Sequence, residues 1–104
     1  MISFVPRGII PAMVTPLDAN GRVAEKPLRK LVNHLIAGGV HGLFPVGSQG
    51  EFFALTLEQK QTVIRIVLDE TRGRAPVYAG TGAVTTREAV ETTKMARDLG
   101  VNAV

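Results

Sequence analysis

The sequence contains no cysteine and no tryptophan, and tyrosine occurs once among its 104 residues. Without cysteine the chain has neither a disulfide framework nor thiolate ligands for a metal ion, and a reducing compartment suits such a chain. The two histidines, His34 and His41, are far apart in the sequence and form no ligand pattern. We therefore expect a cytoplasmic protein without a metal site.

Long runs of hydrophobic residues and of one charge are also missing. Arg7, Asp18 and three prolines interrupt the first twenty residues, so this part of the chain has no predicted membrane span. Twelve Lys and Arg residues are scattered among nine acidic residues without a basic run. This pattern is typical of a solvated surface of mixed charge, and we expect no nucleic-acid partner.

The hydrophobic residues that are present, 45% of the chain, suffice for one modest core. Three short apolar runs, at 8–14, 40–46 and 75–79, each precede a segment with helical periodicity, and residues 101–104 begin a fourth run. The first helix is expected at 25–37. The second helix is expected to start at the Thr56/Gln59 capping box and to end near Thr71, and the third to start at the Thr85/Glu88 capping box and to end near Gly100. In each helix, apolar side chains that recur with a period of 3.6 residues are expected to form the buried face.

The alternation of apolar runs and amphipathic helices predicts an α/β fold with parallel strands. Residues 39–43 are echoed at 100–104, two strand-helix units further on. A (β/α)₈ TIM barrel and a small doubly wound sheet both fit. Since Val104 lies within an uncovered apolar run, we expect residues 1–104 to be the N-terminal fragment of a single TIM-barrel domain. The fragment would hold about three βα units and the start of strand four.

Candidate site residues lie where the predicted strands end, because parallel α/β folds bind ligands at the carboxyl ends of their strands. The three loops are Thr15-Pro16, Gly47–Glu51 and Gly80–Gly82. Glycines on both sides of Ser48-Gln49 favour a sharp turn that points backbone amides into a cavity, which suits a carboxylate or a phosphate.

Simpler interpretations remain open for each loop taken alone. Residues 47–50 could be no more than a strand-to-helix connection. Gly80-Thr81-Gly82 is similar to part of a dinucleotide-binding fingerprint, but Thr85 stands where its third glycine belongs. A nucleotide site is therefore disfavoured.

Taken together, the three loops resemble one family. Residues 11–16, 47–51 and 79–82 match, in order and spacing, the dihydrodipicolinate synthase and N-acetylneuraminate lyase family of class I pyruvate aldolases, over about residues 8–104. The resemblance implies a (β/α)₈ barrel and a lyase or synthase that forms a lysine Schiff base with pyruvate or another 2-oxo acid. It also implies a homo-oligomer, a dimer or tetramer, that needs no cofactor.

The resemblance further implies roles for particular residues. The amides of Ser48 and Gln49 would hold the substrate carboxylate, and the Ser48 hydroxyl would join a proton relay with tyrosines later in the family sequence. Gly47, Thr15 and Thr81 would line the site. Gln49 replaces a second hydroxyl residue of the family, so the choice of aldehyde or sugar-acid substrate, and of synthase, lyase or dehydratase activity, stays open.

The lysine that forms the Schiff base in the family has no counterpart here. The four lysines, Lys26, Lys30, Lys60 and Lys94, all fall in predicted helices rather than at strand ends. We therefore expect these 104 residues to be inactive alone. The alternative is a non-enzymatic α/β module that binds an anion or assembles through an open sheet edge.

An effector site is a further implication of the resemblance. Some synthases of the family bind lysine at a subunit interface with polar and histidine side chains. This chain has Phe52, Phe53, Leu57 and Val84 at the matching positions, keeps Glu88 and has Lys60 where a histidine is common. We expect lysine feedback to be absent.

Overall fold

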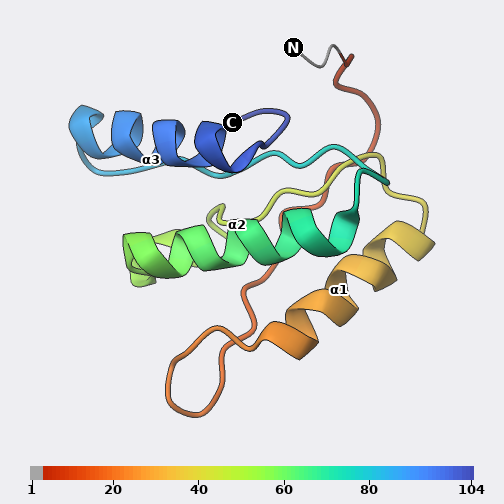
Figure 1. Ribbon diagram of the computed structural model, residues 1–104, viewed down its shortest axis with the longest axis horizontal. Coiled ribbons are helices and arrows are strands. Elements are labelled where there is room, and N and C mark those ends of the chain that lie inside the picture. The colour runs from red at the N-terminus through yellow and green to blue at the C-terminus, as the bar shows by residue number, and fades with distance from the viewer. Residues whose placement is uncertain (1–3) are drawn as a thin grey trace.

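A computed structural model describes residues 4–104 as one layer of helices packed on one layer of extended chain (Figure 1). The helices are α1 (Glu25–Ala37), η1 (Phe52–Ala54), α2 (Leu57–Thr71) and α3 (Thr86–Leu99), of which η1 is a short 3-10 turn. Helix α2 lies between α1 and α3 and packs against both. The molecule measures 34 × 32 × 19 Å, and its short dimension corresponds to the two layers.

Four extended segments lie side by side in chain order. Parallel bridges join Ala12 to Phe44, Leu43 to Val77 and Tyr78 to Ala103, as the alternating pattern predicted. Among the described residues these are single bridges rather than the continuous strands that we expected. Prolines account for part of this difference, because Pro11, Pro45 and Pro76 each place a residue without an N–H group in a segment.

The helix predictions are confirmed with small corrections. Helix α1 has the predicted limits, and Thr56 and Gln59 form a complete reciprocal capping box before α2. At α3 one half of the predicted box is present: the Thr85 hydroxyl accepts a hydrogen bond from the Glu88 amide. Val90 in α3 is 45% exposed, so it lies outside the stripe that this helix buries.

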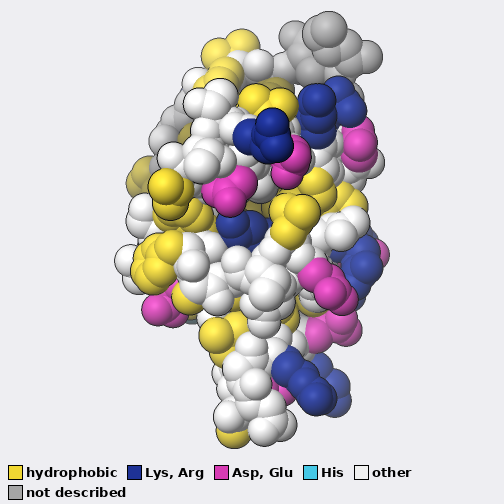
Figure 2. Space-filling model, turned by 90° about the vertical axis from the view of Figure 1, so that its left-hand side faces the viewer, with side chains coloured by type: hydrophobic (Ala, Val, Ile, Leu, Met, Phe, Trp, Pro, Cys, Tyr) yellow, Lys and Arg dark blue, Asp and Glu magenta, His cyan; other side chains and the backbone are white. Residues whose placement is uncertain are grey.

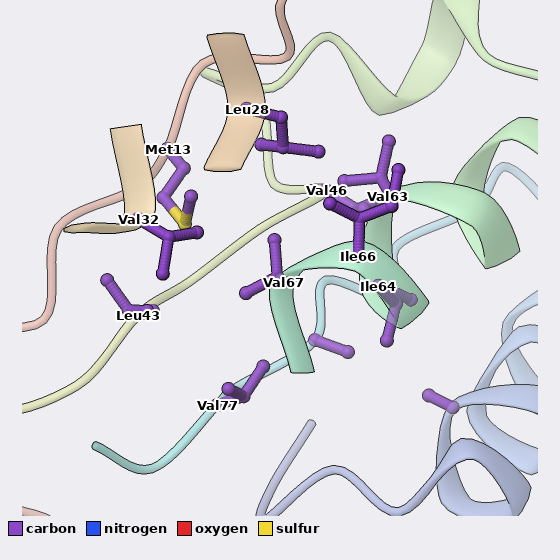
Figure 3. Close-up of a cluster of buried hydrophobic side chains, with 12 residues drawn as sticks. Met13, Leu28, Val32, Leu43, Val46, Val63, Ile64, Ile66, Val67 and Val77 are labelled. Carbon is purple, nitrogen blue, oxygen red and sulfur yellow. The ribbon is translucent and has the colours of Figure 1, made fainter. Parts of the chain in front are cut away.

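The core lies between the helices and the extended segments (Figure 3). Leu28 and Val32 contribute from α1, and Val63, Ile64 and Val67 from α2. The opposing side chains come from the extended segments and include Met13, Leu43, Val46, Val77 and Ala79. Val46 is the last apolar residue before the glycine loop, so the same core that packs the helices also holds the start of that loop.

An ionic contact joins α1 to α2 on the outside of the molecule. The Arg29 guanidinium contacts Asp69 at 2.6 Å and Glu70 at 2.8 Å, and Asn33 donates to Glu70 at 2.7 Å. The hydrogen bond from Arg29 is the main cause that lowers the pKa of Glu70 below its usual value. Within residues 4–104, no helix is long and apolar enough to cross a membrane.

Candidate functional site

The glycine loop, residues 47–51, lies between the ends of the first and third extended segments. On one side the Thr15 hydroxyl donates to the Gly50 carbonyl oxygen at 2.7 Å. On the other side the Gly80 amide donates to the Pro45 carbonyl oxygen at 2.9 Å. The loops after three successive segments therefore meet at one edge, as predicted for the carboxyl ends of parallel strands.

Two backbone hydrogen bonds close the loop on itself. The Gly50 amide donates to the Gly47 carbonyl and the Glu51 amide to the Ser48 carbonyl, both at 3.0 Å. The amides of Ser48 and Gln49 have no backbone acceptor in the part of the chain that the structure describes. The loop's own hydrogen bonds therefore leave two adjacent amides unused, and adjacent free amides at a backbone turn are a common feature of anion sites.

The left-handed backbone positions at this turn lie next to its glycines rather than on them. Val46 has φ 63° and Glu51 has φ 56°, whereas neither Gly47 nor Gly50 has positive φ. A β-branched residue at positive φ is strained, at a typical cost of about 1–3 kcal/mol. The Val46 side chain is 1% exposed, and its burial helps to offset this strain.

The glycines are needed for space instead. A Cβ atom on Gly50 would lie 3.0 Å from the Met13 carbonyl oxygen and 3.0 Å from the Thr15 hydroxyl oxygen. A Cβ atom on Gly80 would lie 2.0 Å from the Val46 carbonyl oxygen, closer than any real contact. Both positions bring two backbone segments together where no side chain fits.

A cavity of about 290 Å³ opens at this edge of the sheet. Of the predicted site residues, Gly47, Ser48 and Thr81 line it, while Gln49 is exposed and does not line it. Thr15 lies behind the loop rather than on the cavity wall. Gly80 and Gly82, which belong to a predicted loop, also line the cavity. Sequence reasoning did not assign the other lining residues to the site: Phe44, Val46, Phe52, Ala79 and Val104.

None of the residues that line this cavity has an ionisable side chain. Lys26 and Lys30 lie in α1, Lys60 in α2 and Lys94 in α3, as predicted. The Lys60 ammonium group is 5.5 Å from the centroid of the Phe52 ring, over its face. The described residues therefore offer a neutral cradle of backbone donors and hydroxyl groups, without a nucleophilic amine in it.

A second hollow, a groove of about 500 Å³, lies where α2 and α3 begin. Figure 2 views this side of the molecule and shows hydrophobic and charged side chains intermingled on it. The six residues that the resemblance placed at an effector site all line this groove: Phe52, Phe53, Leu57, Lys60, Val84 and Glu88. Its hydrophobic side chains are well exposed, with Phe53 at 72%, Leu57 at 50% and Val84 at 98%.

The arrangement of loops and helices agrees with comparisons to known proteins. The sequence pattern of the Dihydrodipicolinate synthetase family matches residues 5–104. The chain belongs to this family. A curated relative, 4-hydroxy-tetrahydrodipicolinate synthase of Phenylobacterium zucineum, is 46% identical over 103 residues, which is 99% of this chain and 35% of the relative.

Solved structures give the same result. Dihydrodipicolinate synthase of Bacillus anthracis superposes with a TM-score of 0.91 at 39% identity, over 97% of this chain and 35% of that protein. The enzyme of Acinetobacter baumannii, solved with pyruvate, gives 0.89 at 43% identity, over 92% and 33%. The chain thus spans about a third of the length of the family members that it matches, and those structures are TIM barrels.

The contact between Gly80 and Val46 makes a testable prediction about stability. Gly80→Ala should destabilise the protein by at least about 1–3 kcal/mol, because the new methyl group must displace the Val46 backbone. Gly82→Ala is the matched control, since its nearest neighbour is an atom of the Phe52 ring at 3.6 Å. Chemical denaturation should show a large loss for the first variant and little for the second; equal losses would contradict the assigned packing.

Proposed function

We propose that this chain is the N-terminal part of a TIM-barrel enzyme that condenses or cleaves 2-oxo acids through a lysine Schiff base. The observation that carries the proposal is the pair of unoccupied amide donors of Ser48 and Gln49, at the edge of a cavity with neutral walls. The pyruvate complex of the Acinetobacter baumannii relative supports a pyruvate-like substrate. The extended segments and helices described above would form the first three βα units of the barrel and the start of its fourth strand.

The substrate carboxylate would accept hydrogen bonds from the two amides. Such donors are preorganised, because the loop is already closed by its own hydrogen bonds and held by its neighbours. Neutral walls suit the binding of a carboxylate by these amides. No fixed negative charge repels the carboxylate, and no fixed positive charge holds it in an orientation that the amides do not set. The contact uses backbone groups, and it is therefore compatible with glutamine at position 49.

The Ser48 hydroxyl would pass a proton during formation of the imine and of the carbon–carbon bond. A hydroxyl group both donates and accepts, as a relay requires. The protonated imine would serve as the electron sink for the reaction. The lysine and its tyrosine partners would come from later parts of the barrel, and the enzyme would work as a homo-oligomer in the cytoplasm without an organic cofactor.

Reductive trapping tests the assignment of the nucleophile. Chain 1–104 mixed with pyruvate and borohydride should give no adduct, because its lysines lie in helices away from the cavity. The full-length protein treated in the same way should be modified at one lysine outside these residues. Peptide mass spectrometry locates the adduct, and a reduced pyruvate adduct on Lys26, Lys30, Lys60 or Lys94 would refute the proposal.

Two substitutions in the full-length protein separate the side-chain role from the backbone role in the loop. Ser48→Ala should lower kcat by roughly 10²- to 10⁴-fold, the usual range for loss of a proton-transfer group, with a smaller effect on KM. Gln49→Ala should leave the KM for the 2-oxo acid nearly unchanged, because the amide donor is retained. Steady-state kinetics with pyruvate measures both, and an unchanged kcat in Ser48→Ala would remove the relay from the mechanism.

The groove between α2 and α3 leads us to propose that free lysine is not an effector. Its phenyl, leucine and valine side chains offer no hydrogen bonds to the ammonium and carboxylate of the ligand, and desolvating a charged group costs more than the roughly 2–7 kcal/mol of a neutral polar group. Lys60 would also repel the ammonium group. Calorimetric titration of lysine into the full-length protein should show no binding, and saturable micromolar binding lost in Glu88→Gln would show that the groove is an effector site.

A further inference from the structure

The position of Thr15 differs from the one that the sequence suggested. We expected its side chain to line the substrate site, yet it lies behind the glycine loop and is 8% exposed. Its hydroxyl donates to the Gly50 carbonyl oxygen at 2.7 Å, a typical distance for a well-formed hydrogen bond from a hydroxyl group. Between residues 4 and 104, this is the one side-chain hydrogen bond to the backbone of residues 47–51.

The contact between the two segments is tight as well as polar. Gly50 approaches the first extended segment so closely that a Cβ atom there would touch both the Met13 carbonyl oxygen and the Thr15 hydroxyl oxygen at 3.0 Å. A valine in place of Thr15 would put a methyl group against the Gly50 carbonyl oxygen, which would then lose its donor. The carbonyl group would have to turn or move to recover a partner.

Movement of this carbonyl group would be transmitted to the amide donors. Gly50 directly follows Gln49, and the Gly50 and Glu51 amides close the loop onto Gly47 and Ser48. Glu51 is held at φ 56°, so the peptide group that Thr15 binds sits at a strained corner of the loop. A rotation of this peptide group therefore changes the direction of the amides at 48 and 49.

We propose that Thr15 is a positioning residue for the substrate carboxylate: through the Gly50 carbonyl it fixes the direction of the Ser48 and Gln49 amides. This inference rests on the function proposed above, because it assigns Thr15 to the same carboxylate-binding loop. Thr15 touches neither the substrate nor the reacting atoms. Its effect is on binding geometry, where a displacement of about 1 Å can change rates by up to roughly 10²-fold.

Kinetics of the full-length protein test the proposal. Thr15→Val keeps the shape but removes the hydroxyl, and it should raise the KM for the 2-oxo acid by roughly ten- to 10²-fold, with a smaller change in kcat. Thr15→Ser keeps the hydroxyl and should restore a KM close to that of the wild type. The KM for the second, aldehyde substrate should stay within about twofold in both variants, because the loop amides bind only the carboxylate of the oxo acid.

Thr92→Val is the matched control. Thr92 is also buried, and its hydroxyl also donates to a backbone carbonyl, that of Glu88 at 2.8 Å, but it lies within α3. It should lower the melting temperature without changing the KM for the 2-oxo acid. If Thr15→Val does not fold, Thr15→Ala removes the hydroxyl without a new methyl contact to the carbonyl and provides the same comparison.

Several outcomes would overturn the inference. An unchanged KM in Thr15→Val or Thr15→Ala would do so, as would an equal rise in Thr92→Val, or a serine variant no better than the valine variant. A wild-type protein that neither turns over a 2-oxo acid nor is trapped by borohydride would instead overturn the proposed function, and the role of Thr15 with it. The two failures are thus distinguished by the wild-type control.

Discussion

The close approach of the Gly80 backbone to the Val46 carbonyl is the contact on which the candidate site depends. A side chain at position 80 would place an atom 2.0 Å from that oxygen, so the two segments meet only because residue 80 is glycine. The Gly80 amide also donates to the Pro45 carbonyl. Together these contacts fix the start of the glycine loop against the third extended segment, while Thr15 fixes its end against the first.

The strain in the loop is linked to the core that packs the helices. Val46 adopts a left-handed backbone conformation, and its side chain lies with those of Val63 and Ile66 from α2 (Figure 3). Burial of that side chain contributes about 1.5–3 kcal/mol relative to an exposed one, which is of the same order as the strain. The free energy gained by packing the helices thus also offsets the strain in the loop. The helices themselves contribute no polar group to the cavity.

Much of the fold follows from local signals in the sequence. The period of apolar residues located α1 within its observed limits, and Thr56 with Gln59 located the start of α2. The capping box acts over a single turn of helix and the apolar period over the length of one helix, so both signals are local in sequence. The meeting of three loops at one edge was also predictable, because parallel strands linked by helices have their carboxyl ends on the same side.

The details of the site were less predictable, because they depend on contacts between distant residues. No sequence pattern places a valine at positive φ, so the conformation of Val46 was missed. The sequence predicted a turn at Gly50 but not its tight contacts, which come from residues 13 and 15. Thr15 was placed at the correct edge of the sheet, but which way its hydroxyl faces depends on the packing of the first segment against the loop.

The pairing of the extended segments has a consequence for how the chain folds. Each parallel bridge joins residues from neighbouring strand-helix units, as Leu43 and Val77 do, so every bridge closes a long stretch of chain. The prolines in three of these segments leave fewer hydrogen bonds to compensate for that loss of entropy. Contacts within the helices are local in sequence, so we expect the helices to form before the bridges persist. We expect the loop at 47–51, whose shape requires both neighbouring segments, to become ordered late.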